Sequence, residues 1–536
     1  DPYAFYSEMR PGTASKTYAL GGYKFKDAKW QKGCKVGHDK PINIYEMHFG
    51  SWKKRGEGQE DWYTYEELAP ILITYLKEHG YNYVEIMPLC EYPCDESWGY
   101  QDTGYFSPTS RYGKPEELKA FVDQCHQAGI GVILDFVPVH FAVNDYALAE
   151  YDGTALYEVK DPEMAVHPMW GTMLYNYDSP MVMDFLISNA CFWLEVFHVD
   201  GLRMDDVDAM LYLDYGRKDG WTPNMYGSNE NLPAIEFLKH LNSIVKKRDP
   251  GTLLIAQEDG LWPELTDSVE NDHIGFDYKW SGGWTRDFLF YLSVDPILRK
   301  NYHDQLTLST LYAYSEHYIL TLGSRDVGNL EEFMAKLPGN EKQKLAQVRE
   351  AYSYMMVHPG CKMMAPGADM PEGLAKCIQA LNTLYKSSPA LYQMDDEYDG
   401  FEWVQLMKYE ENVITFLRKT EKPEETLLVI CNFAAIPYEN YQVGVPFAGK
   451  YKEIFNSDAA EFGGEGVVNS RVKTAKAEEC DEREHSIKVK LPALGVSIYS
   501  CTPGKAPARK KVTAAKTAKD KTAGKLVRTV KAKAPA

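Results

Sequence analysis

The sequence predicts an α/β protein in which a (β/α)₈ TIM barrel is followed by an antiparallel β-sandwich domain and a disordered basic C-terminal tail. From residue 42 to about 365, strand-like runs alternate with helix-like stretches, as in parallel strands joined by helical crossovers. From about 400 to 502, short alternating runs indicate an antiparallel sandwich. Residues 505–536 contain almost no apolar side chains that a fold could bury.

Eight candidate strands occupy the first region, and eight strands close a barrel of this type. They are residues 42–49, 83–89, 131–137, 199–205, 252–257, 275–280, 317–322 and 361–365. The sixth belongs to the segment 271–280, which is expected to pack the core.

Amphipathic helices are expected between the strands. Residues 115–129 carry apolar side chains at helical spacing, and Gly129 supplies the stop. The stretch 138–198 is too long for a simple crossover and predicts a loop excursion over the C-terminal face of the barrel. A last helix is expected near 373–387.

The predicted boundaries are a linker at 1–40, the barrel at 41–395, the sandwich at 396–502 and the tail at 503–536. The total of 536 residues suits a barrel of roughly 250 residues or more with one further domain. The chain begins with Asp1 rather than Met, so we expect it to be part of a longer protein.

The composition is that of an ordinary globular protein, with 44% hydrophobic and 25% charged residues. No apolar run of about 18 residues and no leader pattern are present, so neither a membrane span nor a signal peptide is expected. The ten cysteines are scattered, which favours a reducing, cytoplasmic location. Cys90 and Cys94 are the one close pair, and without a second pair we expect no metal and no cofactor.

The net charge of −19 is distributed unevenly along the chain. Residues 505–536 hold eleven Lys or Arg against one Asp, a charge of +10, so the rest of the chain carries about −29. Such an arm suits an anionic partner, either nucleic acid or the acidic body of the same protein. The alternative is a solvated tail without a partner.

Polar residues cluster after the predicted strands, at the end of a barrel where active sites form. The third, fourth, fifth and seventh strands end in Asp135 and His140, Arg203 and Asp205, Gln257 and Glu258, and Ser324 and Arg325, respectively.

Arg203 and Asp205 are two residues apart, so both face the barrel lumen while Met204 faces the surrounding shell. An Arg beside a carboxylate keeps it ionised and oriented, as a glycosidic nucleophile requires.

Several long segments identify a resemblance. They read SWGYQDTGYFSPTSRYG (97–113), FLISNACFWLEVFHVDGLRMDDV (185–207), AMLYLDYGRKDG (209–220) and GKYKEIFNSD (449–458). With them, nearly everything except the tail resembles the bacterial 1,4-α-glucan (glycogen) branching enzymes of the α-amylase superfamily, glycoside hydrolase family 13. This chain begins with DPYAF (1–5). In the family, that segment follows an N-terminal carbohydrate-binding module, so the resemblance implies that this chain lacks the module.

The resemblance implies that α-1,4-glucan is the substrate and that a cleaved segment is transferred, with retention, to a 6-hydroxyl through a glycosyl-aspartate. It gives Asp205 the position of the nucleophile and Arg203 that of its orienting partner. Asp135 and His140 match the first motif, and Tyr100, with Trp98 nearby, matches the aromatic platform for the sugar.

Two catalytic positions depart from the family. The acid/base Glu aligns with Gln257 in IAQED (255–259), and an amide cannot donate the proton. Glu258 is a possible substitute, but a shift of one residue along a strand turns its side chain to the other face.

The family's Ser-His-Asp-Glu-Val becomes GSRDV (323–327) here, which puts Ser324 in place of a substrate-binding His and Arg325 in place of the transition-state Asp. A charge about 5 Å from an oxocarbenium ion is worth about 3 kcal/mol, so reversing it changes the barrier by about 6–7 kcal/mol, about five powers of ten in rate. The segment after the eighth strand, APGADMPEG (365–373), departs as well.

Three functions follow from these observations. The first is a branching enzyme of glycogen biosynthesis in which a neighbour such as Glu258 or Asp326 compensates. The second is a glucan-binding pseudoenzyme or a regulator of an intact branching enzyme. Between full activity and weakened or lost catalysis in a branching enzyme by family, we favour the latter. The third is a scaffold that acts through its basic tail.

Overall fold

The computed structural model describes residues 1–33, 38–260 and 262–504. Eight parallel strands close a barrel in which each strand pairs with the next along the chain and the last pairs with the first. They are β1 (Asn43–Met47), β2 (Tyr83–Ile86), β5 (Gly131–Phe136), β8 (Gly201–Met204), β9 (Leu253–Ala256), β10 (Tyr278–Trp280), β11 (Tyr318–Leu322) and β12 (Cys361–Met364). The predicted eight-stranded barrel is confirmed. Of the tail predicted at 503–536, residues 505–536 lie outside the described residues, and Pro503 is the last residue of a strand.

The barrel lumen is apolar at one end and polar at the other. Ile44, Ile133 and Ile255 belong to a buried cluster that fills the interior. Two positions further along β1 and β5 lie Glu46 and Asp135, both buried. Because side chains alternate along a strand, residues two apart share the lumen face, so the polar layer lies at the carboxyl ends of the strands.

Helices cover the outside of the barrel. The longer ones are α2 (Tyr65–His79), α3 (Pro115–Gln127), α5 (Pro180–Val196), α7 (Leu232–Arg248), α8 (Gly282–Ser293), α13 (Glu341–Val357) and α14 (Glu372–Ser387). The predicted helices at 115–129 and 373–387 are α3 and α14. Gly129 follows α3 with φ of +81°, a conformation that favours glycine after a helix end.

Short elements extend the carboxyl ends of the strands. The long connection after β5 forms the hairpin of β6 (His140–Phe141) and β7 (Met173–Leu174), with α4 (Pro162–Ala165) between them. A second hairpin joins β3 (Cys90–Glu91) and β4 (Gly104–Pro108). The helices α6 (Val207–Leu211), α11 (Ser324–Val327) and α12 (Leu330–Lys336) also follow strand ends, whereas α9 (Asp304–Thr307) and α10 (Ser309–Tyr312) lie between α8 and β11.

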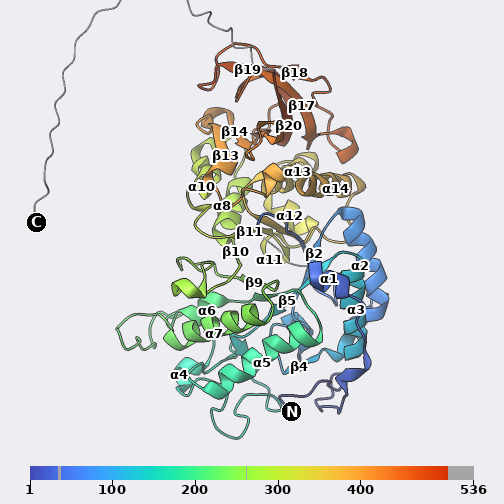
Figure 1. Ribbon diagram of the computed structural model, residues 1–536, viewed down its shortest axis with the longest axis vertical. Coiled ribbons are helices and arrows are strands. Elements are labelled where there is room, and N and C mark those ends of the chain that lie inside the picture. The colour runs from blue at the N-terminus through green and yellow to red at the C-terminus, as the bar shows by residue number, and fades with distance from the viewer. Residues whose placement is uncertain (34–37, 261, 505–536) are drawn as a thin grey trace, which may run out of the picture.

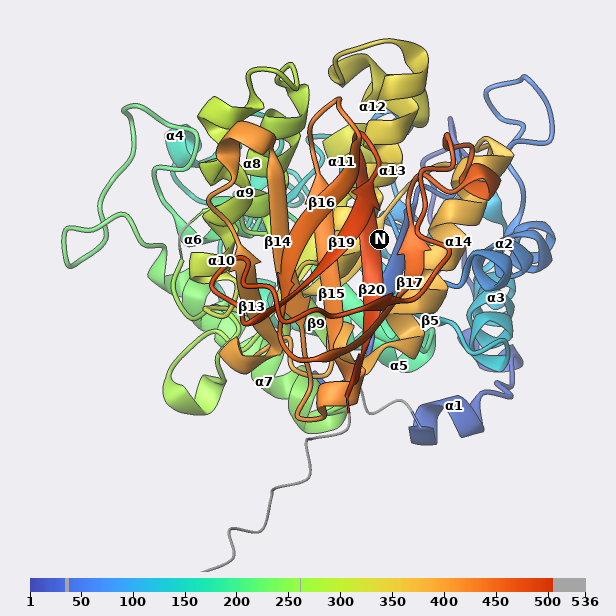
Figure 2. The ribbon, with the colours of Figure 1, turned by 90° about the horizontal axis from the view of Figure 1, so that it is seen from above.

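The C-terminal part is antiparallel, as predicted. Its six-stranded sheet has the order β13 (Phe401–Gln405), β14 (Val413–Arg418), β15 (Leu427–Asn432), β20 (Gly495–Pro503), β17 (Gly449–Asn456), β18 (Lys473–Thr474), and a second sheet pairs β16 (Tyr438–Val445) with β19 (His485–Leu491). These strands gather at one end of the molecule (Figure 1), and β14, β15, β20 and β17 lie side by side in the view onto that end (Figure 2). Apolar residues of both sheets form one buried cluster.

The other face of the large sheet shares the main hydrophobic core with the barrel helices. Phe416 and Ile498 of the sheet belong to the same cluster as Tyr354 of α13. Two buried arginines cross the junction: Arg299 donates to the carbonyl of Phe433 at 3.0 Å, and Arg349 donates to that of Ser457 at 2.8 Å.

The N-terminal segment packs against the barrel. Asp27, just before α1 (Ala28–Gly33), accepts hydrogen bonds from His126 at 3.0 Å and His198 at 2.8 Å. Trp30 of α1 donates to Asp200 at 2.6 Å. Over the part of the chain that the structure describes, no helix is both long and apolar enough to cross a bilayer.

Candidate functional site

A cavity of about 380 Å³ opens at the carboxyl ends of the barrel strands. Its lining combines aromatic, acidic and basic side chains, as expected of a site that stacks on a ring and binds hydroxyl groups. It is lined by Glu46, Met87, Glu96, Ser97, Trp98, Tyr100, Gln101, His140, Trp170, Arg203, Asp205, Asp206, Trp280, Ser324 and Arg325.

Arg203 of β8 organises the floor of the cavity. Its guanidinium donates to both carboxylate oxygens of Asp135 and to Oδ1 of Asp205. It also donates to the hydroxyl of Tyr100 at 2.8 Å, and that hydroxyl donates to Asp135 at 2.6 Å. The network therefore fixes Asp205 and Tyr100 relative to each other, without a ligand.

Gln257 follows β9 and joins the same network. Its side-chain oxygen Oε1 accepts from Nη1 of Arg203 at 3.1 Å and from the backbone N–H of Asp206 at 3.3 Å. Both partners are donors, so the amide oxygen has to be the atom that faces them. The side chain is buried, beside Arg203 and behind the cavity surface.

Glu258 points elsewhere. It is fully buried, and its Oε2 accepts from Nζ of Lys279 on β10. Its other neighbour is Asp208 of α6, whose pKa is raised to about 7 by burial and by the Glu258 carboxylate. Glu258 therefore lies in a buried cluster outside the cavity lining.

The loop after β11 brings Ser324 and Arg325 to the cavity and takes Asp326 away from it. Nη1 of Arg325 lies 4.0 Å from Oδ1 of Asp205. The backbone N–H of Ser324 donates to Glu46 at 2.6 Å. Asp326 accepts from the N–H of Gly323 at 3.0 Å and caps α11, and burial raises its pKa to about 6.

The remaining predicted residues, Trp98, Tyr100 and His140, lie on the walls. Trp98 is 43% exposed and its indole stacks on His48 with ring centroids 5.6 Å apart, which leaves an aromatic surface for a sugar ring. His140 is buried, and burial lowers its pKa to about 4, so its imidazole is neutral at pH 7. Of the ten predicted site residues, seven line the cavity, Asp135 and Gln257 bind Arg203 of that lining, and Glu258 does neither.

Sequence reasoning missed eight of the fifteen lining residues, and three of these bear directly on the site. Trp280, at the end of the segment expected only to pack the core, lines the cavity and holds the Arg203 guanidinium 4.5 Å from its ring centroid. Trp170 is 52% exposed at the rim, and Glu46 lies on the floor. The position of Glu46 at the end of the first strand was a usable signal, because polar residues at strand ends define such sites.

Buried acids surround the single guanidinium of Arg203. Burial raises the pKa values of Glu46 and Glu85, and it raises that of Asp135 to about 6 although Arg203 opposes this. The arrangement can orient a carboxylate toward a sugar carbon and bind hydroxyl groups. The other acids that line the cavity are already engaged: Glu46 accepts from the N–H of Ser324, Glu96 from the thiol of Cys94, and Asp206 from His167 and Tyr215.

Comparisons with known proteins decide the family. Residues 72–156 match the family described as "Alpha amylase, catalytic domain", and residues 403–502 match "Alpha amylase, C-terminal all-beta domain". The chain is 43% identical to the 1,4-alpha-glucan branching enzyme GlgB of Halothermothrix orenii, over 93% of this chain and 83% of that protein. This chain belongs to the 1,4-alpha-glucan branching enzyme family.

Other branching enzymes show the same level of similarity. GlgB of Marinobacter nauticus is 43% identical over 92% of this chain and 82% of its own length, and GlgB of Butyrivibrio fibrisolvens is 41% identical over 93% and 82%. A solved α-amylase from Geobacillus thermoleovorans, complexed with acarbose, shares the fold with a TM-score of 0.64 at 14% identity, covering 88% of this chain and 99% of that one. The resemblance of the sequence to branching enzymes is thus confirmed at the level of family and fold.

Proposed function

We propose that this branching-enzyme relative binds α-1,4-glucan in the cavity at the carboxyl ends of the strands and that its branching activity is weakened or lost. Asp205 holds the position of the nucleophile, oriented by Arg203. The observation that carries the proposal is the side chain of Gln257, whose amide oxygen is bound by two donors beside Asp205. General acid/base help is worth about 10² to 10⁴ in rate, and an amide cannot supply it.

The position of Arg325 supports the same conclusion. Its guanidinium lies 4.0 Å from Asp205 and forms part of the cavity lining. Transfer of a glucan segment passes through an oxocarbenium-like transition state, and a cation in this place raises its free energy. The barrier then rises in addition to the effect of Gln257.

Glu258 and Asp326, the two acids considered as substitutes for the missing catalytic carboxylates, are already bound to other groups. Glu258 binds Lys279, and Asp326 caps a helix. Moving either carboxylate into the cavity requires breaking a buried interaction, which typically costs about 3–5 kcal/mol for a buried ion pair.

Glucan binding is supported by the parts of the site that remain. Trp98, Trp170 and Tyr100 supply aromatic surface, and the Arg203 network supplies fixed donors and acceptors. Carbohydrate rings pack on such surfaces through their apolar faces while hydroxyl groups bind polar side chains. The proposed partner is therefore a glycogen- or amylose-like glucan.

Two measurements on the full chain test the proposal. Electrophoresis in gels containing glycogen is expected to show retardation. Incubation with amylose is expected to leave iodine absorbance nearly unchanged. A fall in absorbance with new α-1,6 linkages, abolished by Asp205→Ala, would identify an active branching enzyme and overturn the proposal. Absence of retardation would refute glucan binding.

A further inference from the structure

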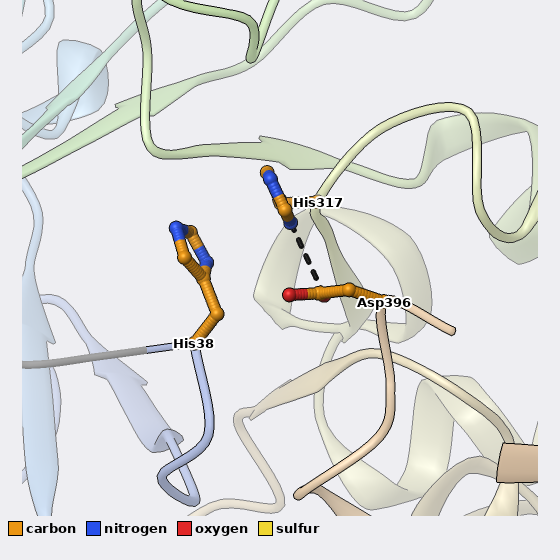
Figure 3. Close-up of side chains that lie close together, drawn as sticks. All are labelled: His38, His317 and Asp396. Atoms are coloured by element: carbon orange, nitrogen blue, oxygen red, sulfur yellow. Dashed lines mark hydrogen bonds and ion pairs between the residues drawn. The ribbon is translucent and has the colours of Figure 1, made fainter.

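Three potential metal ligands meet at the end of the barrel opposite the cavity. His38 precedes β1, His317 precedes β11, and Asp396 lies in the connection between α14 and β13. One donor atom from each lies within 4.8 Å of the other two, and Figure 3 shows the two rings and the carboxylate turned toward a common space. Within residues 1–33, 38–260 and 262–504, this is the one such trio of His, Cys, Asp or Glu side chains.

The backbone beside His317 is held firmly. Glu316 accepts hydrogen bonds from the N–H groups of Leu265 and Thr266, both at 2.8 Å. The N–H of His317 itself donates to Oγ1 of Thr266 at 3.1 Å. The imidazole therefore projects from a fixed point.

Asp396 is placed in the same way by its neighbour. Asp395 accepts from the N–H of Gly360 at 2.9 Å and from the buried guanidinium of Arg418. The Asp396 carboxylate then reaches Nδ1 of His317, with Oδ1 at 3.1 Å. Two of the three donors are thus preorganised by the fold, as a ligand site requires.

His38 supplies the adaptable donor. Its ring stacks on His317 with centroids 4.0 Å apart and lies 5.2 Å from the ring of Tyr278. The His38 imidazole offers two ring nitrogens, either of which is a common metal ligand. Because the residue is exposed, its ring can turn without disturbing packed side chains.

We propose that His38, His317 and Asp396 bind one divalent transition-metal ion, with zinc the best fit. Two imidazoles and a carboxylate are zinc ligands at about 2.0–2.2 Å, and water takes the fourth tetrahedral position. Tetrahedral ligation brings the donor atoms to about 3.4 Å from one another, so His38 moves closer to the fixed pair.

Such an ion connects three parts of the chain that are far apart in sequence. It binds the folded state, in which the three donors meet, and therefore stabilises that state. Since it lies at the opposite end of the barrel from the cavity, the inference goes beyond the proposed function and does not depend on it.

The test uses full-length, chelator-treated protein carrying Cys94→Ser, which removes an exposed thiol that competes for zinc. Titration calorimetry with zinc is expected to give one site, and zinc is expected to raise the melting temperature. His38→Ala, His317→Ala and Asp396→Asn should each weaken binding by about 100-fold or more, since even groups that only orient a ligand are worth about 10- to 100-fold.

His240→Ala, which removes an exposed histidine of α7, is the matched control and should bind zinc like the parent. Should His317→Ala fail to fold, His38→Ala still decides the matter, because it alters an exposed loop side chain. The proposal is wrong if zinc does not shift the melting temperature of the parent, or if the shift survives all three substitutions. Neither result bears on glucan binding.

Discussion

The guanidinium of Arg325 lies 4.0 Å from the carboxylate of Asp205, measured from Nη1 to Oδ1. The same oxygen accepts a hydrogen bond from Arg203. Two guanidinium groups therefore act on one carboxylate. Under the proposed function, a sugar cation forming beside Asp205 would lie near the Arg325 guanidinium, and that positive charge opposes transition-state stabilisation.

Restoring both altered positions is expected to restore branching. Gln257→Glu supplies the acid/base, worth about 10² to 10⁴ in rate. Arg325→Asp reverses the unfavourable charge. Because both act in one transition state, their effects should be non-additive, and the double variant should exceed either single variant by at least about tenfold in new α-1,6 linkages.

Asp205→Ala in the double variant is the control and should abolish the gained activity. A double variant that binds glucan but is no more active than the parent would show that other departures, such as residues 365–373, prevent catalysis.

Trp98→Ala is expected to weaken glucan binding. The indole is 43% exposed and stacked on His48, so its removal takes away a sugar platform at little cost in stability. Aromatic stacking contributes about 0.5–1.5 kcal/mol, which corresponds to a roughly two- to tenfold loss in affinity. Retardation in glycogen gels measures it, and Tyr398→Ala, at a 72% exposed position remote from the cavity, is the matched control. Equal losses in both variants would place glucan binding elsewhere.

Lys279→Met is expected to destabilise the fold by about 3–5 kcal/mol, because it leaves the buried Glu258 carboxylate without its partner. The double variant Glu258→Leu with Lys279→Met removes both charges and should recover most of the loss. Denaturant unfolding of the two variants gives the comparison. If the double variant is as unstable as the single, packing around Lys279 rather than charge is responsible.

Asp208→Asn should stabilise the protein more at pH 8 than at pH 5. The folded-state pKa of about 7 lies above the unfolded value of 3.8, so the wild-type carboxyl contributes stability below about pH 4 that is lost as pH rises through 7. Asparagine does not titrate and avoids that loss. The melting temperature at pH 8 is expected to rise by about 2 °C or more.

The control is Asp272→Asn, because the hydrogen bond from Lys239 lowers the pKa of Asp272 and the sign is reversed. This variant should show no gain at pH 8. A loss of stability for Asp208→Asn that is equal at both pH values would mean that the hydrogen bonds from Asp259 and Gly260 outweigh the charge effect.

The architecture could be predicted because its signals are local. Each barrel strand is a short, largely apolar run, and polar residues follow the third, fourth, fifth and seventh at the carboxyl end. The short strand β18 (Lys473–Thr474) has no such alternation and was missed. The pairing of Glu258 with Lys279 could not be predicted, because it joins side chains of neighbouring strands that are 21 residues apart and no local sequence pattern indicates it. Trp280 was assigned to the core for the same reason, since an aromatic residue at a strand end packs inward whether or not a cavity lies above it.

The hydrophobic core shared between the large sheet and α13 determines how the protein unfolds. If the polypeptide were cut between α14 and β13, α13 would expose an apolar surface to water. Arg299 would lose the carbonyl of Phe433 as an acceptor, and Arg349 would lose that of Ser457. Neither fragment is then expected to fold stably on its own. Heating the intact protein should accordingly produce one calorimetric peak, with both halves melting together.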